Sequence, residues 1–316
     1  MTVHDNAVPP IVVITGATAT GKTDLAMALA DRMPVQLISV DSAMVYRQMD
    51  VGTAKPTAEE RRRYPHALVD IRDPSEAYTV AEFVADADRE VQQARAAGRV
   101  PVLVGGTMMY LKAFRDGLDD LPATTPAVRA AIAAEAATLG WPALHAELTA
   151  IDPVAAAGIH PNNPQRLARA LEVHRMTGRP LSAFWGTAMT AAQRHACPVT
   201  EFWVDVADRA ELHARIALRL ERMFAAGFVA EVAALRDRGD LTPTLPSLRA
   251  VGYRQVWQYL DGALPAEELH ARVLAATRGL ARRQYTWLRA WAHTLQRVSG
   301  HDTTRAVDLL CQLAFP

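Results

Sequence analysis

Cysteine is scarce in this sequence of 316 residues, and its scarcity removes two classes of protein. Only Cys197 and Cys311 occur, far apart and without a neighbouring cysteine or a paired histidine at ligand spacing. A disulfide framework or a structural zinc site requires such spacing. The chain therefore belongs to neither class, and neither thiol receives a role.

Net charge and long apolar runs are also absent. Lysine plus arginine number 34, and aspartate plus glutamate number 34, so any surface for nucleic acid must be a local patch. The first ten residues hold no basic segment, and the apolar run Ile11–Ile14 is too short for a signal peptide or a membrane span. We therefore expect a cytoplasmic protein without a membrane partner, and a monomer is the working expectation.

The spacing of apolar residues predicts an α/β fold. Helical spacing follows the first apolar run, and a capping box of Thr79 and Glu82 begins a later helix that Gly98 ends. Because predicted strands alternate with predicted helices, the sheet should be parallel. The strands are expected at Pro10–Thr15, Val35–Val40, Val100–Val104 and Glu201–Val206, and the helices at Asp24–Arg32, from Thr79 to Gly98 and after Thr107.

The middle of the chain has a different texture. From Leu118 to Trp185, prolines punctuate alanine-rich helical stretches, and no convincing strand lies between them. The length of the chain also favours two domains of about 150 residues each. We predict an all-helical domain at residues 119–200, inserted into a core formed by residues 1–118 and 201–316. After Val206 the chain should be helical, with long helices at Arg209–Arg236 and Glu267–Trp291.

The most specific motif is the segment GATATGKT, which fits the pattern G-x-x-x-x-G-K-[ST] and lies between a predicted strand and a predicted helix. Glycines let backbone N–H groups point at a phosphate, the helix dipole adds positive potential, and Lys22 neutralises charge. The Thr23 hydroxyl can bind Mg²⁺. The motif predicts a diphosphate site with Mg²⁺ as cofactor, formed by Gly16, Ala17, Thr18, Ala19, Thr20, Gly21, Lys22 and Thr23.

Two polar residues follow other predicted strands. Asp41 and Thr107 lie at carboxyl ends of strands, where ligands bind in open parallel sheets. At neutral pH Asp41 can accept a proton or hold Mg²⁺ through water, and its alternative role is that of a turn former or helix cap. Thr107 fits a helix N-cap equally well. His66 pairs with no nucleophile or ligand cluster in the sequence, so we interpret it as structural.

Beyond the glycine-rich segment, three more stretches carry a family resemblance: VDSAMVYRQMDVGTAKP, LVGGTMMYLKA, and VGYRQVWQYL with ATRGLARRQYTWLR further on. Together the four resemble the tRNA dimethylallyltransferase family of bacterial type, also called isopentenyl-tRNA transferases, over nearly the whole chain. The resemblance implies a P-loop NTPase-like core. The family usually has proline and serine where this chain has Ala17 and Thr20, a difference that concerns the stiffness of the loop.

The resemblance implies a reaction and roles for individual residues. Members transfer a dimethylallyl group from dimethylallyl diphosphate to the exocyclic amine of the adenine on the 3′ side of the anticodon in tRNA. Matched by position, the glycine-rich loop would hold the diphosphate with Mg²⁺, and Asp41 would be the general base. Thr107 would contact the oxygen that bridges diphosphate and allyl group, and Arg219 would help bind the diphosphate.

A helix near the C-terminus carries a basic stripe. Arg278, Arg282, Tyr285 and Arg289 follow helical spacing, which suits recognition of an RNA backbone with one stacked base. The alternative is a solvated charged face. The resemblance implies that tRNA contacts Asp41, Ser42, Ala43, Met44, Thr107, Arg129, Gln165, Arg166, Leu167, Ala168, Arg169, Arg249, Gly252, Tyr253, Arg254, Arg282, Arg283, Gln284, Tyr285, Thr286, Trp287, Leu288 and Arg289.

Two other functions share parts of this pattern. A nucleotide-dependent kinase of small molecules would use the same phosphate loop, with Asp41 activating a hydroxyl group. A non-catalytic RNA-binding protein would use a nucleotide only as a switch, and it would keep its activity without Asp41. Turnover of ATP without an allylic diphosphate distinguishes the first, and tRNA binding without a product distinguishes the second.

Overall fold

The computed structural model describes residues 9–291 and 295–314. Two compact units form within this part of the chain: Asp116–Thr190, and the segments on either side of it. Among the described residues, no helix is both long enough and apolar enough to cross a membrane.

The first unit contains a six-stranded parallel sheet in the order β3-β2-β4-β1-β5-β6, which confirms the predicted α/β class. Its central strand is a run of β-branched residues buried on both faces, as expected when helices cover both sides of a sheet. The two faces alternate along this strand: Val12 and Ile14 pack into one core, and Ile11 and Val13 into the other. The strands are β1 (Ile11–Thr15), β2 (Val35–Val40), β3 (His66–Ala67), β4 (Val100–Gly105), β5 (Val199–Asp205) and β6 (Gln296–Ser299).

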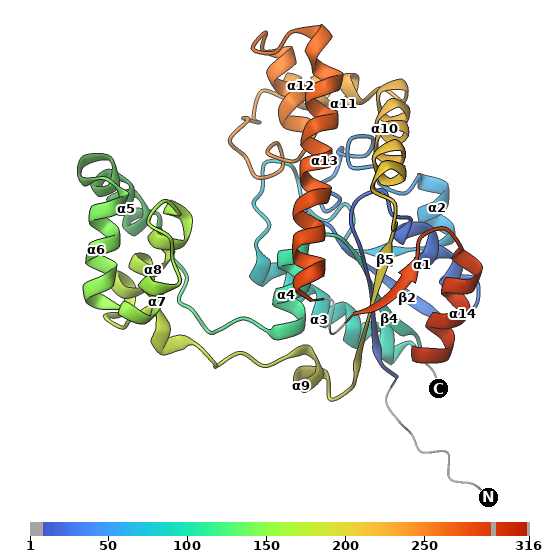
Figure 1. The fold of residues 1–316 in the computed structure, drawn as a ribbon, viewed down its shortest axis with the longest axis horizontal. Coiled ribbons are helices and arrows are strands. Elements are labelled where there is room, and N and C mark those ends of the chain that lie inside the picture. Colours follow the sequence, from blue (N-terminus) through green and yellow to red (C-terminus); the bar gives the residue numbers. More distant parts are fainter. Residues whose placement is uncertain (1–8, 292–294, 315–316) are drawn as a thin grey trace, which may run out of the picture. The chain divides into compact units, whose positions relative to one another are not determined.

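Helices cover the two faces of this sheet. The core that contains Val12 and Ile14 packs against the first and last helices, which lie together on one side of the sheet in Figure 1. The remaining long helices of this unit pack against the other core. The helices of the unit are α1 (Lys22–Ala30), α2 (Ala58–Arg63), α3 (Val80–Ala96), α4 (Met108–Asp116), α9 (Ala191–His195), α10 (Arg209–Ala225), α11 (Phe228–Asp237), α12 (Tyr253–Leu260), α13 (Ala266–Ala290) and α14 (Thr303–Ala314).

The structure corrects two expectations for the C-terminal half. The predicted helix Arg209–Arg236 is two helices, because Gly227 adopts a left-handed backbone with φ 95° and ends α10. The stretch after Val206 is not wholly helical either, since β6 adds a strand to the sheet edge. Its four residues, QRVS, form a strand through pairing with β5, so no local pattern marks them.

The second unit is a helical bundle with its own apolar core. Thr125 accepts a hydrogen bond from the Val128 N–H and caps its first helix, with Pro126 at the first turn. Leu144, Leu148 and many other apolar side chains fill the centre. The helices are α5 (Pro126–Leu139), α6 (Trp141–Ile151), α7 (Pro153–Ala157), α8 (Pro164–Thr177) and the 3₁₀ turn Leu181–Phe184.

The boundaries of this unit differ from the expected 119–200. Residues 191–200 belong to the first unit. Ala191 is buried in its core, and both Arg194 and His195 contact the Asp88 carboxylate on α3. These contacts join residues more than a hundred positions apart. The C-terminal boundary of the helical unit therefore could not be predicted from the composition of the sequence.

Candidate active site

The glycine-rich loop joins β1 to α1 and has the geometry of an anion site. A side chain on Gly16 would place its Cβ 2.5 Å from the Val204 carbonyl oxygen, so only glycine fits there. Ala19 and Gly21 both have positive φ, which curls the backbone at the start of α1. The N-cap Gly21 offers no side chain to the first N–H groups of the helix. Those donors are therefore available to a phosphate.

The two positions that depart from the usual loop sequence tie the loop together. Ala17 is fully buried, and the Thr20 hydroxyl donates a hydrogen bond to its carbonyl oxygen over 2.9 Å. The same carbonyl accepts a hydrogen bond from Lys22 Nζ at 2.6 Å. The loop thus keeps a compact form without the proline that family members usually have.

Two cations lie close together in this region. Desolvation and then the charge of the nearby Arg219 lower the pKa of Lys22 to about 7, while Asp41 opposes the shift. Burial also lowers the pKa of Arg219, with Asp41 and Asp24 acting in the opposite sense. Asp41 lines the same cavity as both cations whereas Asp24 does not, which leaves excess positive charge in the cavity. A bound diphosphate would neutralise that charge.

Asp41 and Thr107 follow the neighbouring strands β2 and β4. Asp41 Oδ1 accepts hydrogen bonds from the N–H groups of Ala43 at 2.8 Å and Met44 at 3.2 Å, so the residue is also the turn former considered above. Within the described residues Oδ2 has no hydrogen-bond partner and can receive a proton. Thr107 Oγ1 accepts a hydrogen bond from the Ser42 N–H at 3.0 Å, which joins the two loops.

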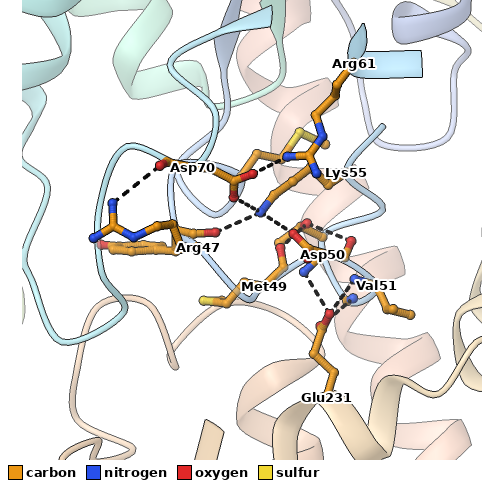
Figure 2. Close-up of polar contacts among 12 residues, drawn as sticks. Arg47, Met49, Asp50, Val51, Lys55, Arg61, Asp70 and Glu231 are labelled. Atoms are coloured by element: carbon orange, nitrogen blue, oxygen red, sulfur yellow. Dashed lines mark hydrogen bonds and ion pairs between the residues drawn. The ribbon is translucent and has the colours of Figure 1, made fainter. Parts of the chain in front are cut away.

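A network of charged side chains around the buried Lys55 holds the loop that carries Thr53, and Thr53 in turn orients Arg219. Arg219 Nη2 donates a hydrogen bond to the Thr53 carbonyl oxygen at 3.2 Å. Figure 2 shows how Glu231 on α11 supports this loop: its carboxylate accepts hydrogen bonds from the N–H groups of Asp50 at 2.8 Å, Val51 at 2.7 Å and Gly52 at 3.0 Å.

Lys55 fixes the other end of the same loop (Figure 2). Its side chain is 1% exposed and its Nζ lies 2.6 Å from a carboxylate oxygen of both Asp50 and Asp70. Arg61 also pairs with Asp70. No local sequence pattern marks this network, because the residues that contact Glu231 are about 180 positions away along the chain.

Helix α13 reaches the phosphate loop through Gln284. Its side chain is 7% exposed, accepts a hydrogen bond from the Thr18 N–H at 2.9 Å and donates one to the Gly106 carbonyl oxygen at 2.9 Å. Both ends of the amide are therefore occupied by backbone groups. Gln284, which is expected to contact tRNA, joins the phosphate loop to the loop that carries Thr107.

These elements surround one crevice with a volume of about 550 Å³, here called the active-site crevice. One part of its wall is apolar, which gives it room for a hydrocarbon group beside the charged loop. His66, interpreted from sequence as structural, also lines it, and its Nε2 is buried without a hydrogen-bond partner in the described residues. The expected site residues that line the crevice are Thr18, Ala19, Lys22, Thr23, Asp41, Ser42, Ala43, Met44, Thr107, Arg219, Arg249, Gly252, Tyr253, Arg283, Gln284 and Trp287; the apolar wall includes Met108, Leu220, Met223, Phe228 and Val273.

Other expected site residues lie elsewhere. Leu167 and Leu288 are 0% exposed. The Leu167 side chain lies in the core of the second unit, and the Leu288 side chain lies in a core of the first unit. Arg169 is held within the second unit by the Thr124 hydroxyl and the Pro122 carbonyl oxygen. The remaining positions that do not line the crevice are Arg129, Gln165, Arg166 and Ala168 in the second unit, and Gly16, Ala17, Thr20, Gly21, Arg254, Arg282, Tyr285, Thr286 and Arg289 in the first.

A parallel sheet with a phosphate loop after β1, and a carboxylate and two cations in the same crevice, define an α/β enzyme of the P-loop class. A model of the IPP transferase family matches residues 44–291. The chain belongs to this family.

Similar proteins are known from several bacteria. The chain is 52% identical over 310 residues to "tRNA dimethylallyltransferase 2" of Hahella chejuensis, covering 95% of this chain and 93% of the relative. It is 51% identical over 306 residues to "tRNA dimethylallyltransferase" of Bordetella petrii, covering 96% and 98%. Among solved structures, the full-length tRNA isopentenylpyrophosphate transferase of Bacillus halodurans is similar with 36% identity and a TM-score of 0.67, over 96% of this chain and 95% of that one.

Proposed function

We propose that this protein is a tRNA dimethylallyltransferase. It transfers a dimethylallyl group from dimethylallyl diphosphate to the exocyclic amine of the adenine on the 3′ side of the anticodon. The observation that carries the proposal is the composition of the active-site crevice: a phosphate loop, a free carboxylate oxygen and an apolar wall share one space. The relatives named above carry the name tRNA dimethylallyltransferase, which favours this reaction over that of a kinase.

The crevice residues account for departure of the diphosphate. The allylic carbon leaves its oxygen with cationic character while negative charge builds on the diphosphate. Lys22, Arg219 and the N–H groups of the loop would stabilise that charge, the role that fixed donors play in many enzymes. The apolar wall near Phe228 would hold the hydrocarbon end and exclude water from the cationic carbon.

Asp41 would complete the reaction as general base. The adenine amine forms a bond to the allylic carbon as the bond from that carbon to oxygen breaks, and the amine then carries an extra proton. Asp41 Oδ2 would receive this proton, while Oδ1 stays bound to the Ala43 and Met44 N–H groups. The base must leave its stack to enter the crevice, which costs least in an unpaired loop such as the anticodon.

The donor groups of the crevice fit Mg²⁺. Among the described residues no cluster of three or more metal-binding side chains occurs, and Mg²⁺ needs none, because it binds through one or two protein oxygens together with phosphate and water. Thr23, which lines the crevice, would supply such an oxygen, and Asp41 Oδ2 stays available for the proton. When bound, the ion would neutralise part of the charge on the leaving diphosphate.

Exposed residues, of which Arg249 and Arg283 also line the crevice, would bind the rest of the anticodon arm. Gln165 and Arg166 are exposed at the start of α8, and Arg249, Arg254 and Arg283 are exposed on the first unit. Such residues suit contacts to an RNA backbone, which position the substrate. We further propose that the protein acts in the cytoplasm and as a monomer.

Release of diphosphate tests the proposal against the kinase alternative. Purified protein with Mg²⁺ and dimethylallyl diphosphate should release pyrophosphate only when unmodified tRNA is added, and replacing the donor by ATP should yield no ADP. Formation of ADP from ATP, with no pyrophosphate released from the allylic donor, would establish the kinase. Retention of tRNA on the protein with neither product would establish the non-catalytic binding protein.

A further inference from the structure

Helix α13 has two faces that line two different cavities. Val273, Leu280, Gln284 and other residues at the same helical angle line the active-site crevice. Arg278, which lies about 160° around the helix from Leu280 at roughly 100° per residue, lines a second cavity with a volume of about 570 Å³. The basic stripe expected on this helix therefore does not face the crevice.

The second cavity lies between α13 and the beginning of α10. Its basic lining residues are Arg209 and His213 from α10 and Arg278, Arg282 and Arg289 from α13. Ala275 and Gly279 keep the α13 face open, because they have little or no side chain.

An apolar cluster separates the second cavity from the crevice. Leu212 and Ala281 line the cavity, Ile216 lines the crevice, and all three belong to one cluster that also contains Ala17 of the phosphate loop. An anion in the second cavity would therefore not be the diphosphate that reacts.

The positive charge of this cavity is not balanced by the protein. Within the described part of the chain, none of its four arginines forms an ion pair, and no carboxylate lines the cavity. Arg209 is the first residue of α10, where the helix dipole disfavours a cation. Desolvation, followed by the charges of Arg278 and Arg209, lowers the pKa of His213.

Two details indicate that a ligand with hydrogen-bond acceptors completes the cavity. Arg278 Nε is buried and has no hydrogen-bond partner in the described residues. Tyr285 is fixed by a hydrogen bond from its hydroxyl to Asp205 Oδ1 at 2.8 Å, and its ring lies 5.6 Å from the Arg289 guanidinium. A buried donor without an acceptor is unfavourable, and guanidinium groups bind phosphate oxygens in pairs.

We propose that the second cavity is a phosphate-binding site, separate from the active-site crevice, in which Arg209 and Arg278 contact the phosphate group. A phosphate of the tRNA backbone and a free diphosphate or nucleotide present the same chemistry. Of these we expect the tRNA backbone, and this choice of source rests on the proposed function; the phosphate site itself does not.

The test uses the double variant Arg209→Gln, Arg278→Gln. Its matched control is Arg222→Gln, an exposed arginine on α10 outside both cavities. Titration with tRNA at several salt concentrations should show affinity about tenfold weaker for the double variant and a salt slope smaller by roughly 1.5, as expected for two lost phosphate contacts. The control should match the wild type in both.

A second arm identifies the source of the phosphate. Calorimetry with inorganic pyrophosphate is done in a Lys22→Met background, so that the crevice contributes little binding. A loss of residual pyrophosphate binding in the double variant, with tRNA affinity unchanged, would assign the cavity to a free phosphate ligand. Loss in both arms would show that it accepts either source. If the double variant equals the control in both arms, the proposal is wrong.

Discussion

At the scale of single residues, Asp41 carries the most direct prediction. The variant Asp41→Ala should lose transfer activity by about a hundredfold or more, because a positioned general base contributes at least that much. Its affinity for tRNA should stay near that of the wild type. The measurement is the rate of product formation under single-turnover conditions, with a separate tRNA titration. A rate close to wild type would remove Asp41 from the mechanism.

Lys22 gives a prediction about pH. Its pKa is lowered to about 7, so the free enzyme loses this charge as the pH rises through 7, whereas a bound diphosphate favours the charged form. The KM for the donor should therefore rise between pH 7 and pH 8.5, by up to about tenfold per pH unit at the upper end. Lys22→Arg, whose side chain stays charged, should show a flatter profile. A flat profile in the wild type would contradict this assignment.

These residues could be predicted from the sequence because their signals are local. The phosphate loop has fixed spacing between a strand and a helix, and Asp41 and Thr107 directly follow strands. It could not show that Asp41 Oδ1 is bound to two backbone N–H groups while Oδ2 is free, since that depends on the turn at Ala43 and Met44. His66 was set aside because no neighbour in sequence marks its place in the crevice wall.

At the scale of elements, the contact between α11 and the loop of Asp50 to Thr53 should control donor binding. Glu231→Gln removes the charge that holds three backbone N–H groups, so Thr53 and with it Arg219 should be less well placed. We expect the KM for the donor to rise about tenfold, with tRNA affinity unchanged.

The control for Glu231→Gln is Asp237→Asn, an exposed carboxylate on the same helix. A simple structural role would lower thermal stability and leave the KM for the donor as in the wild type. Equal KM values for both variants would therefore contradict the positioning role of Glu231.

The bridge from α13 to the phosphate loop gives a prediction about stability. Gln284→Leu should leave the Thr18 N–H and the Gly106 carbonyl oxygen without partners, at a cost of about 1–3 kcal/mol in the free energy of unfolding. Urea unfolding measures this cost, and Gln92→Leu on an exposed part of α3 is the control. If both variants unfolded at the same urea concentration, the hydrogen bonds of Gln284 would not contribute to the stability of the protein.

Helix α13 shows what a sequence pattern leaves open at this scale. Its length and start were close to the prediction, Glu267–Trp291 against Ala266–Ala290. Its function was assigned to a single tRNA surface, whereas Gln284 is buried between loops and Arg282 and Arg289 line a different cavity from Arg283 and Trp287. Periodicity identifies faces of a helix, and the partner of each face comes only from packing.

At the scale of the whole molecule, the second unit should serve tRNA and leave donor chemistry unaffected. The double variant Gln165→Ala, Arg166→Ala changes two exposed side chains at the start of α8. It should weaken tRNA binding several-fold and reduce the salt dependence, while the KM for the donor stays unchanged. Arg62→Ala, exposed on α2, is the control. Equal tRNA affinity in the two variants would leave this unit without the proposed role.

The sequence predicted that a helical unit interrupts the α/β unit more accurately than it predicted the residues at which the helical unit begins and ends. Proline-punctuated helices between two stretches of α/β pattern identified the inserted unit. Its C-terminal limit and the edge strand β6 depended on contacts between distant segments, such as His195 with Asp88 and β6 with β5. Such contacts form only when the whole chain has folded, and the local composition of the sequence does not predict them.

The proposed reaction is the transfer of a dimethylallyl group to one adenine of tRNA. The most direct measurement is mass spectrometry of nucleosides from unmodified tRNA after incubation with the protein, Mg²⁺ and dimethylallyl diphosphate, with ATP replacing the donor in a parallel reaction. We expect N6-dimethylallyladenosine only with the allylic donor, located on the 3′ side of the anticodon and absent with Asp41→Ala. Unmodified adenosine in every reaction, with a folded and donor-saturated protein, would contradict it.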